Sequence, residues 1–278
     1  MNLGIRAHDF SAETVEELAE KISQKGFQNI QLALPKSFGS INSDVGNLSP
    51  GFGNHMRKKL AEKNVQIAVL GCYFNMVDPD ENARRKSIEK FKEYIRYASC
   101  FGCKIVGSET GSFNEDYSYH VDNHGEKAFQ IVLETAKELA LEAEKFGVIV
   151  GLENSVTLTV HTPERMKRLL DETNSNNVQV IYDPIGFISP EKYKEQDEII
   201  ERSLDILSDR IAAVHVKDFI IENGERVIVP SGKGLLNFEL LFKILKKKKP
   251  FVEFIMEDIR EEFMEESIKF LRETYEKA

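Results

Sequence analysis

The sequence predicts an α/β protein, a single (β/α)8 TIM barrel domain that spans residues 1–278. Eight short apolar segments alternate with longer amphipathic segments, which is the pattern of parallel strands covered by helices. No glycine-rich phosphate loop follows the first apolar segment, as it normally would in an open doubly wound sheet, and Ala7-His8-Asp9-Phe10 stands there instead. A chain of 278 residues also suits one large domain.

The eight expected strands are rich in Val, Ile, Leu and Phe, as strands that helices cover should be. They are residues 3–7, 27–34, 65–70, 104–107, 148–153, 178–183, 211–217 and 251–257.

Helix signals occupy the segments between these strands. Ser11 precedes the first helical pattern, in which Val15, Leu18, Ala19 and Ile22 share one face. Asp78-Pro79, Thr162-Pro163 and Ser189-Pro190 each place a capping residue before a Pro at the first helical position. Gly26, Gly102 and Gly147 follow helical patterns, where a left-handed residue ends a helix, and a last helix is expected over 260–275.

Three long loops follow strands, so we expect them at the C-terminal face of the barrel, where barrel enzymes build their active sites. They are residues 35–54, 110–124 and 219–236. The first is rich in Gly, Ser, Asn and Pro, and we read it either as a mobile lid or as a surface excursion without a role.

The net charge of −9 argues against a general nucleic-acid binder, which needs clustered Lys and Arg. No apolar run reaches the ~20 residues of a membrane span, and the first residues do not resemble a signal peptide. With three cysteines, an odd number, we expect a reduced, cytoplasmic protein without nucleic-acid or membrane partners. Cys100-Phe-Gly-Cys103 has the redox spacing but lies between a helix and a strand, so we expect a structural role.

Alternate side chains of a barrel strand face the axis and the surrounding helices, and polar residues at the strand ends fall on the axial parity. In the strand 211–217, Ala212, Val214 and Val216 share the helix-facing parity, and Ile211, Ala213, His215 and Lys217 share the axial one. The same test places Arg6, His8, Glu153, Asp183 and Glu257 toward the axis. Asp218 has helix-facing parity, so we expect it to cap the loop that follows.

Glu153, Asp183, His215 and Glu257 end four neighbouring strands. Three converging carboxylates repel one another unless some are protonated or a cation joins them. One imidazole and three carboxylates suit one divalent ion, Mn, Mg, Co or Zn. The alternative is a buried ion network in which Arg6, Lys217 or Arg260 neutralises the acids. Four further residues, His8, Lys217, Glu109 and Arg6, are candidates for binding a small-molecule substrate.

Four short motifs carry a resemblance that covers nearly the whole chain. Val150-Gly-Leu-Glu153-Asn, Ile181-Tyr-Asp183-Pro, Val214-His215-Val-Lys217-Asp218 and Ile255-Met-Glu257 resemble the xylose-isomerase-like TIM barrels of the sugar phosphate isomerase/epimerase family. The resemblance implies that Glu153, Asp183, His215 and Glu257 hold one divalent metal ion. It also implies that Glu153 and Glu257 act as acid/base partners on the substrate carbon, and that the protein is a homodimer or homotetramer.

The implied function is that of a metal-dependent isomerase or epimerase, which acts on a sugar, sugar phosphate or related polyol ketone through an enediolate. The sequence departs from the epimerase branch at Gly186, where that branch has His, and at Lys233, where an acid is usual. Isomerisation, epimerisation of another sugar and inosose-type dehydration therefore all stay open. A barrel that binds a sugar or polyol without turning it over is a further alternative. An apurinic-site endonuclease is the least favoured, because it needs three zinc ions and many more His ligands than six His can supply.

Overall fold

Eight parallel strands close into a barrel in the order β1-β10-β7-β6-β5-β4-β3-β2 in the computed structural model, which describes residues 1–278. The strands are β1 (Asn2–Arg6), β2 (Asn29–Leu32), β3 (Gln66–Gly71), β4 (Ile105–Glu109), β5 (Ile149–Glu153), β6 (Val178–Tyr182), β7 (Ile211–Val216) and β10 (Glu253–Met256). All eight expected strands are present, with ends shifted by up to two residues.

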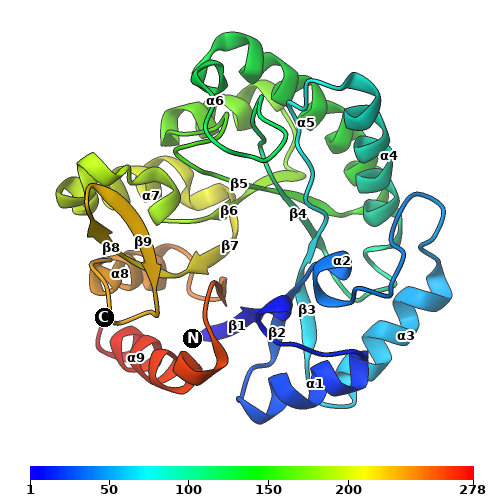
Figure 1. Cartoon of the computed structure of the whole chain (residues 1–278), viewed down its shortest axis with the longest axis horizontal. Coiled ribbons are helices and arrows are strands. Elements are labelled where there is room, and N and C mark those ends of the chain that lie inside the picture. The colour runs from blue at the N-terminus through cyan, green and yellow to red at the C-terminus, as the bar shows by residue number, and fades with distance from the viewer.

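Helices surround the barrel, and Figure 1 shows them as an outer ring around the strands. The long helices are α1 (Val15–Gln24), α3 (Pro50–Ala61), α4 (Glu81–Tyr97), α5 (Glu126–Phe146), α6 (Pro163–Thr173), α7 (Gln196–Leu207), α8 (Phe238–Lys248) and α9 (Met264–Lys277). A short helix α2 (Leu34–Ser37) precedes α3. None of these helices combines the length and apolar character that crossing a membrane requires.

The helix starts correct some of the expected caps. Thr162 caps α6 as predicted. Helix α1 is capped by Thr14, three residues after Ser11, and α4 by Asp80 rather than Asp78. Ser189 begins a 3-10 turn, and α7 starts only at Gln196. At α1 and α4 the cap lies a few residues further on, next to the first helical turn, where the Thr14 side chain accepts the N–H of Glu17 and the Asp80 side chain accepts those of Asn82 and Ala83.

The hydrophobic core has two parts. A cluster of 70 buried residues fills the space between strands and helices, and a cluster of four, Val69, Ile105, Ile181 and Ala213, lies inside the barrel. The axial parity of Ile181 and Ala213 is thus confirmed. The prediction for Ile211 is wrong, because this residue belongs to the outer cluster and Ala212 packs against the inner one. The register between β6 and β7 shifts by one residue at this point, which reverses the faces before the shift.

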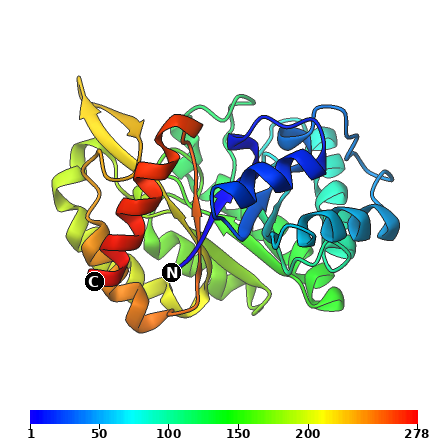
Figure 2. The same ribbon diagram turned by 90° about the horizontal axis from the view of Figure 1, so that it is seen from below.

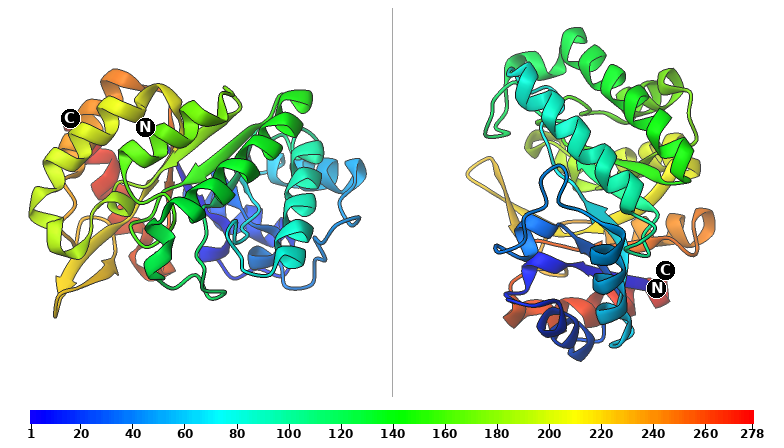
Figure 3. Two further views of the ribbon diagram at one scale, coloured as in Figure 1. Left: turned by 90° about the horizontal axis from the view of Figure 1, so that it is seen from above. Right: turned by 90° about the vertical axis from the view of Figure 1, so that its right-hand side faces the viewer.

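The loop over 219–236 contains a hairpin that we did not predict. Strands β8 (Asp218–Glu222) and β9 (Glu225–Val229) pair in antiparallel fashion around Asn223-Gly224, whose φ values of 52° and 83° are those of a two-residue hairpin turn. The hairpin projects beyond one end of the barrel (Figures 2 and 3). Asn-Gly between alternating apolar residues is the strongest local signal of a hairpin, so this hairpin could have been predicted from the sequence.

Buried side chains anchor the long loops. The Asp218 carboxylate accepts hydrogen bonds from the backbone N–H groups of Phe219, Gly232, Gly234 and Leu236, which confirms its loop-capping role. The Glu93 carboxylate accepts the N–H groups of Gly46 and Leu48 and ties the first long loop to α4. Asn75 and Asn123 hold the loop over 110–124 in the same way.

Candidate metal and active site

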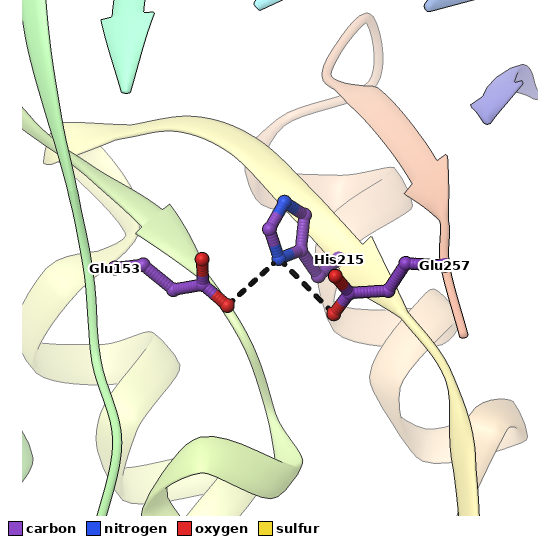
Figure 4. Close-up of side chains that lie close together, drawn as sticks. All are labelled: Glu153, His215 and Glu257. Carbon is purple, nitrogen blue, oxygen red and sulfur yellow. Dashed lines mark hydrogen bonds and ion pairs between the residues drawn. The ribbon is translucent and has the colours of Figure 1, made fainter. Parts of the chain in front are cut away.

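Three of the four predicted metal ligands converge at the C-terminal ends of barrel strands. His215 Nδ1 lies 2.9 Å from Glu153 Oε1 and 3.2 Å from Glu257 Oε1 (Figure 4). One ligand atom from each residue lies within 4.8 Å of the others, and all three side chains are buried. All three lie at the C-terminal ends of apolar strands: Glu153 is the last residue of β5, His215 the last but one of β7, and Glu257 directly follows β10.

The close packing of unlike charges perturbs this group strongly. Burial alone would lower the pKa of His215, but the carboxylates of Glu153 and Glu257 outweigh it and raise the pKa well above 6.5. Burial alone would raise the pKa of Glu257, but His215 and Lys217 hold it well below its usual range. Without a bound cation, the imidazole and the ammonium therefore balance the carboxylates.

Asp183, the fourth predicted ligand, lies next to this group but not within it. Its Oδ2 lies 3.1 Å from Lys217 Nζ, and its Oδ1 accepts the N–H of Ile185. The Asn154 side chain bonds the backbone of Asp183 on both sides, accepting its N–H at 3.1 Å and donating to its C=O at 2.8 Å. The turn is thus fixed, and ligation by Asp183 stays a prediction.

Gly186 follows in this turn, and its lack of a side chain is required. A Cβ atom there would lie 2.4 Å from the backbone oxygen of Asn154 and 2.6 Å from its side-chain nitrogen. Any side chain would push away the amide that holds Asp183. The imidazole that the resemblance led us to look for at this position therefore has no room here.

Lys217 and Arg6, which we expected to bind a substrate, form ion pairs with carboxylates in this structure. Lys217 Nζ lies 2.5 Å from Glu257 Oε1, and Arg6 Nη1 lies 3.5 Å from Glu257 Oε2. Arg6 also pairs with Asp9 and Asp258, each at 2.6 Å. This part of the alternative ion network is present. Arg260 does not belong to it, because it is exposed and pairs with Glu262.

His8 and Glu109 lie near the rim of the site. Burial, with the nearby charges of Arg6 and Lys36, lowers the pKa of His8 to about 4, so the ring is neutral near pH 7. Its buried Nδ1 has no hydrogen-bond partner. Glu109 ends β4 beside Glu153 in the sheet register, and burial together with Glu153 raises the pKa of Glu109 to about 7.

The sequence analysis missed two residues behind His215. Gln31 in β2 is fully buried, and its Oε1 lies 2.9 Å from His215 Nε2. The Gln31 Nε2 donates a hydrogen bond to the hydroxyl of Tyr73. The available signal was an amide side chain inside the expected strand 27–34, but the parity test was applied only to polar strand ends.

The three donor atoms fit a divalent ion. Two carboxylate oxygens and one imidazole nitrogen form a ligand set that Zn²⁺ and Mn²⁺ accept. Since Nε2 faces the Gln31 oxygen, Nδ1 is the nitrogen that faces the two carboxylates. This is the one group of three or more His, Cys, Asp or Glu residues in the chain with such spacing.

Comparisons with known proteins place this geometry in context. A family model described as "Xylose isomerase-like TIM barrel" matches residues 19–274. The inosose dehydratase of Glaesserella parasuis serovar 5 (strain SH0165) is 23% identical over 270 residues, which cover 89% of this chain and 86% of the relative. Among solved structures, a D-tagatose 3-epimerase-like protein superposes with a TM-score of 0.76 at 21% identity, covering 99% of this chain and 97% of that one. The IOLI protein with a bound zinc atom gives a TM-score of 0.70 at 19% identity, with 99% and 96% covered. The chain belongs to the xylose isomerase-like TIM barrel family.

Proposed function

We propose that the chain is a divalent-metal-dependent isomerase or epimerase that acts on a ketose, a ketose phosphate or a related polyol ketone. One observation carries the proposal: two buried carboxylates, Glu153 and Glu257, flank the same His215 nitrogen at 2.9 and 3.2 Å. A proton on a carbon next to a carbonyl is removed by a base on one face and returned to the same or the opposite face. Two carboxylates around one point provide a group for each face.

Glu153, His215 and Glu257 would hold the ion, and Asp183 would complete the set. A divalent ion bound there polarises a substrate carbonyl and stabilises the negative charge that develops on its oxygen. Because His215 and Lys217 hold the pKa of Glu257 well below its usual range, Glu257 is ionised near pH 7 and can accept a proton. Lys217 also fixes Asp183 through its contact at 3.1 Å.

Two rim residues can handle protons on substrate hydroxyls. Glu109, with a pKa of about 7, is present in both its acidic and its basic form near neutral pH. The neutral His8 ring has a free Nδ1 that can hydrogen-bond a hydroxyl group.

Inosose-type dehydration is a second candidate, and the similarity to inosose dehydratases over most of the chain favours it. It would begin with the same proton removal next to a ketone. A hydroxyl group on the neighbouring carbon would then leave as water, as the new carbon–carbon double bond forms. The departing oxygen needs a proton, and Glu109 in its acidic form could supply it.

The test follows exchange of carbon-bound hydrogen with solvent. Protein stripped with EDTA and reloaded with Mn²⁺ is incubated in deuterated water with ketoses, ketose phosphates and inososes, and the products are followed by proton NMR. We expect deuterium at the carbon next to the carbonyl. Glu153→Gln and Glu257→Gln should slow its entry by about 10²- to 10⁴-fold. Glu253→Gln is the matched control, because Glu253 begins β10, whereas Glu257 follows directly after the opposite end of this strand.

The outcomes separate the candidates. Deuterium entry with a change of configuration or of carbonyl position indicates epimerisation or isomerisation, and a product lighter by one water indicates dehydration. A metal-loaded protein that binds one of these ketones tightly and incorporates no deuterium would contradict both and favour a binding barrel.

A further inference from the structure

A buried glutamine contacts the side of His215 that faces away from the candidate metal ligands. Gln31 lies in the middle of β2, its side chain is fully buried, and its Oε1 is 2.9 Å from His215 Nε2. Strands β2 and β7 are not neighbours in the barrel, so this contact crosses the interior. A buried amide in an apolar strand is costly unless its hydrogen bonds are made, and here both ends of the amide are bonded.

The contact determines where the imidazole proton sits. An amide oxygen only accepts hydrogen bonds, so His215 Nε2 must carry a hydrogen to bond it. When a cation takes the place of the hydrogen on Nδ1, the ring is neutral, its one remaining hydrogen stays on Nε2, and Nδ1 offers a lone pair. That lone pair points toward Glu153 Oε1 and Glu257 Oε1, at 2.9 and 3.2 Å, where a cation would be bound. If the amide were turned around, Nδ1 would carry the hydrogen and would be closed to a cation.

Tyr73 favours the observed orientation of the amide. Its hydroxyl accepts the hydrogen bond that Gln31 Nε2 donates. Burial and the nearby carboxylates of Glu153, Glu257 and Glu109 raise the pKa of this hydroxyl well above 10, so it stays neutral and can accept a hydrogen bond. The hydroxyl lone pairs thus remain for the amide nitrogen, and the amide oxygen remains for His215.

We propose that Gln31 is a positioning residue, which holds His215 in the tautomer with hydrogen on Nε2 and so presents Nδ1 to a divalent cation between Glu153 and Glu257. Tyr73 supports it by fixing the orientation of the amide. The inference rests on the proposed function, since it concerns the cation of that same site. A partner that orients a ligating histidine typically contributes 10- to 100-fold in metal affinity.

The test compares three variants by their affinity for Zn²⁺ and Co²⁺, measured by competition with a chelator and by the visible absorption of bound Co²⁺. Gln31→Met keeps the shape of the side chain but removes the acceptor, and it should weaken binding by about 10- to 100-fold. Gln31→Glu keeps an acceptor and should stay close to the wild type. Asn29→Leu is the matched control, because Asn29 is a buried amide on the same strand that bonds Gln66 instead.

A second measurement reads the tautomer directly. Long-range ¹H–¹⁵N spectra of the Zn²⁺-loaded, histidine-labelled protein should show hydrogen on Nε2 of His215, with its signals assigned by their absence in His215→Gln. Gln31→Met should lose or mix this signature while its thermal unfolding in EDTA stays cooperative. If Gln31→Met binds Zn²⁺ like the wild type and keeps the Nε2 tautomer, the positioning role is wrong. A wild-type protein that binds no divalent ion would instead overturn the proposed function.

Discussion

Replacing Glu109 with Gln should stabilise the metal-free protein, and increasingly so as the pH rises. Burial and the neighbouring Glu153 raise the pKa of Glu109 from 4.5 to about 7 in the folded state. Below pH 4.5 the carboxyl is protonated in both the folded and the unfolded state. Between 4.5 and 7 the unfolded chain releases this proton and the folded protein retains it, so stability falls as the pH rises. The amide of Gln is neutral at every pH and avoids this loss.

The magnitude follows from the two pKa values. A change from 4.5 to about 7 corresponds to about 3 kcal/mol. Since the side chain at the end of β4 retains some contact with solvent, we expect about 2 kcal/mol in practice. For a protein of this size that amounts to a rise in melting temperature of about 4–8 °C at pH 8.

The assay is urea unfolding followed by circular dichroism in EDTA at pH 5 and pH 8, for the wild type and Glu109→Gln. The advantage of the variant should grow by about 2 kcal/mol between the two pH values. Glu126→Gln is the control, because Glu126 is exposed and Arg168 lowers its pKa to about 2. A difference that does not change with pH, or one that favours the wild type at pH 8, would refute the reasoning.

Three further predictions concern two turns, at Gly186 and Asp218, and one stacked pair of histidines. Gly186→Ala would place a Cβ atom 2.4 Å from the Asn154 oxygen and should cost about 1–3 kcal/mol in urea unfolding, with weaker divalent-ion binding because Asp183 is displaced. Asp218→Asn weakens a buried carboxylate that accepts four backbone N–H groups, and amide hydrogen exchange over 219–236 should speed up at least tenfold while barrel amides stay protected. His161 stacks on His124 at 3.6 Å, and burial together with His124 lowers the pKa of His161 to about 4. Because the His161 side chain keeps partial contact with solvent, stability should fall by about 1 kcal/mol as the pH drops from 7 to 5, and His161→Phe should remove that loss while Phe keeps the stacking contact.

The barrel could be predicted because its signals are local. Each strand is a short apolar run between helical patterns, and the alternation of side chains along a strand fixes which residues face the axis. These signals were sufficient to predict that Glu153, His215 and Glu257 lie together. The parity argument failed at Ile211, where the register shift between β6 and β7 reverses the faces. A register shift depends on the neighbouring strand, so one strand's sequence does not reveal it.

The position of the Asp183 carboxylate depends on tertiary contacts that the sequence does not predict. The parity of β6 brings it to the axis, but its carboxylate is then shared between Lys217 Nζ and the N–H of Ile185. Asn154 belongs to the preceding strand end and fixes the same turn from 29 residues away. Gln31 was missed for a related reason, since its partner His215 is 184 residues distant. The sequence predicts where each strand ends, but it does not predict the hydrogen bonds and ion pairs between strand ends, because these join residues far apart in the chain.

The balance of charge favours the proposed metal site over a purely structural ion network. The carboxylates of Glu153, Asp183 and Glu257 face the buried ammonium of Lys217, and Arg6 divides its charge among Glu257, Asp9 and Asp258. In the metal-free protein the charged imidazole of His215 offsets part of this excess of negative charge, because Glu153 and Glu257 raise its pKa well above 6.5, and a divalent ion between them would take over that role. A network that served stability alone would gain nothing from this excess, since buried charges are costly to desolvate and apolar residues of similar volume stabilise a core at least as well. The position of His215 Nδ1 also supports the proposed metal site. A nitrogen between two carboxylates offsets their negative charge only when it is protonated or when a cation lies between the three groups.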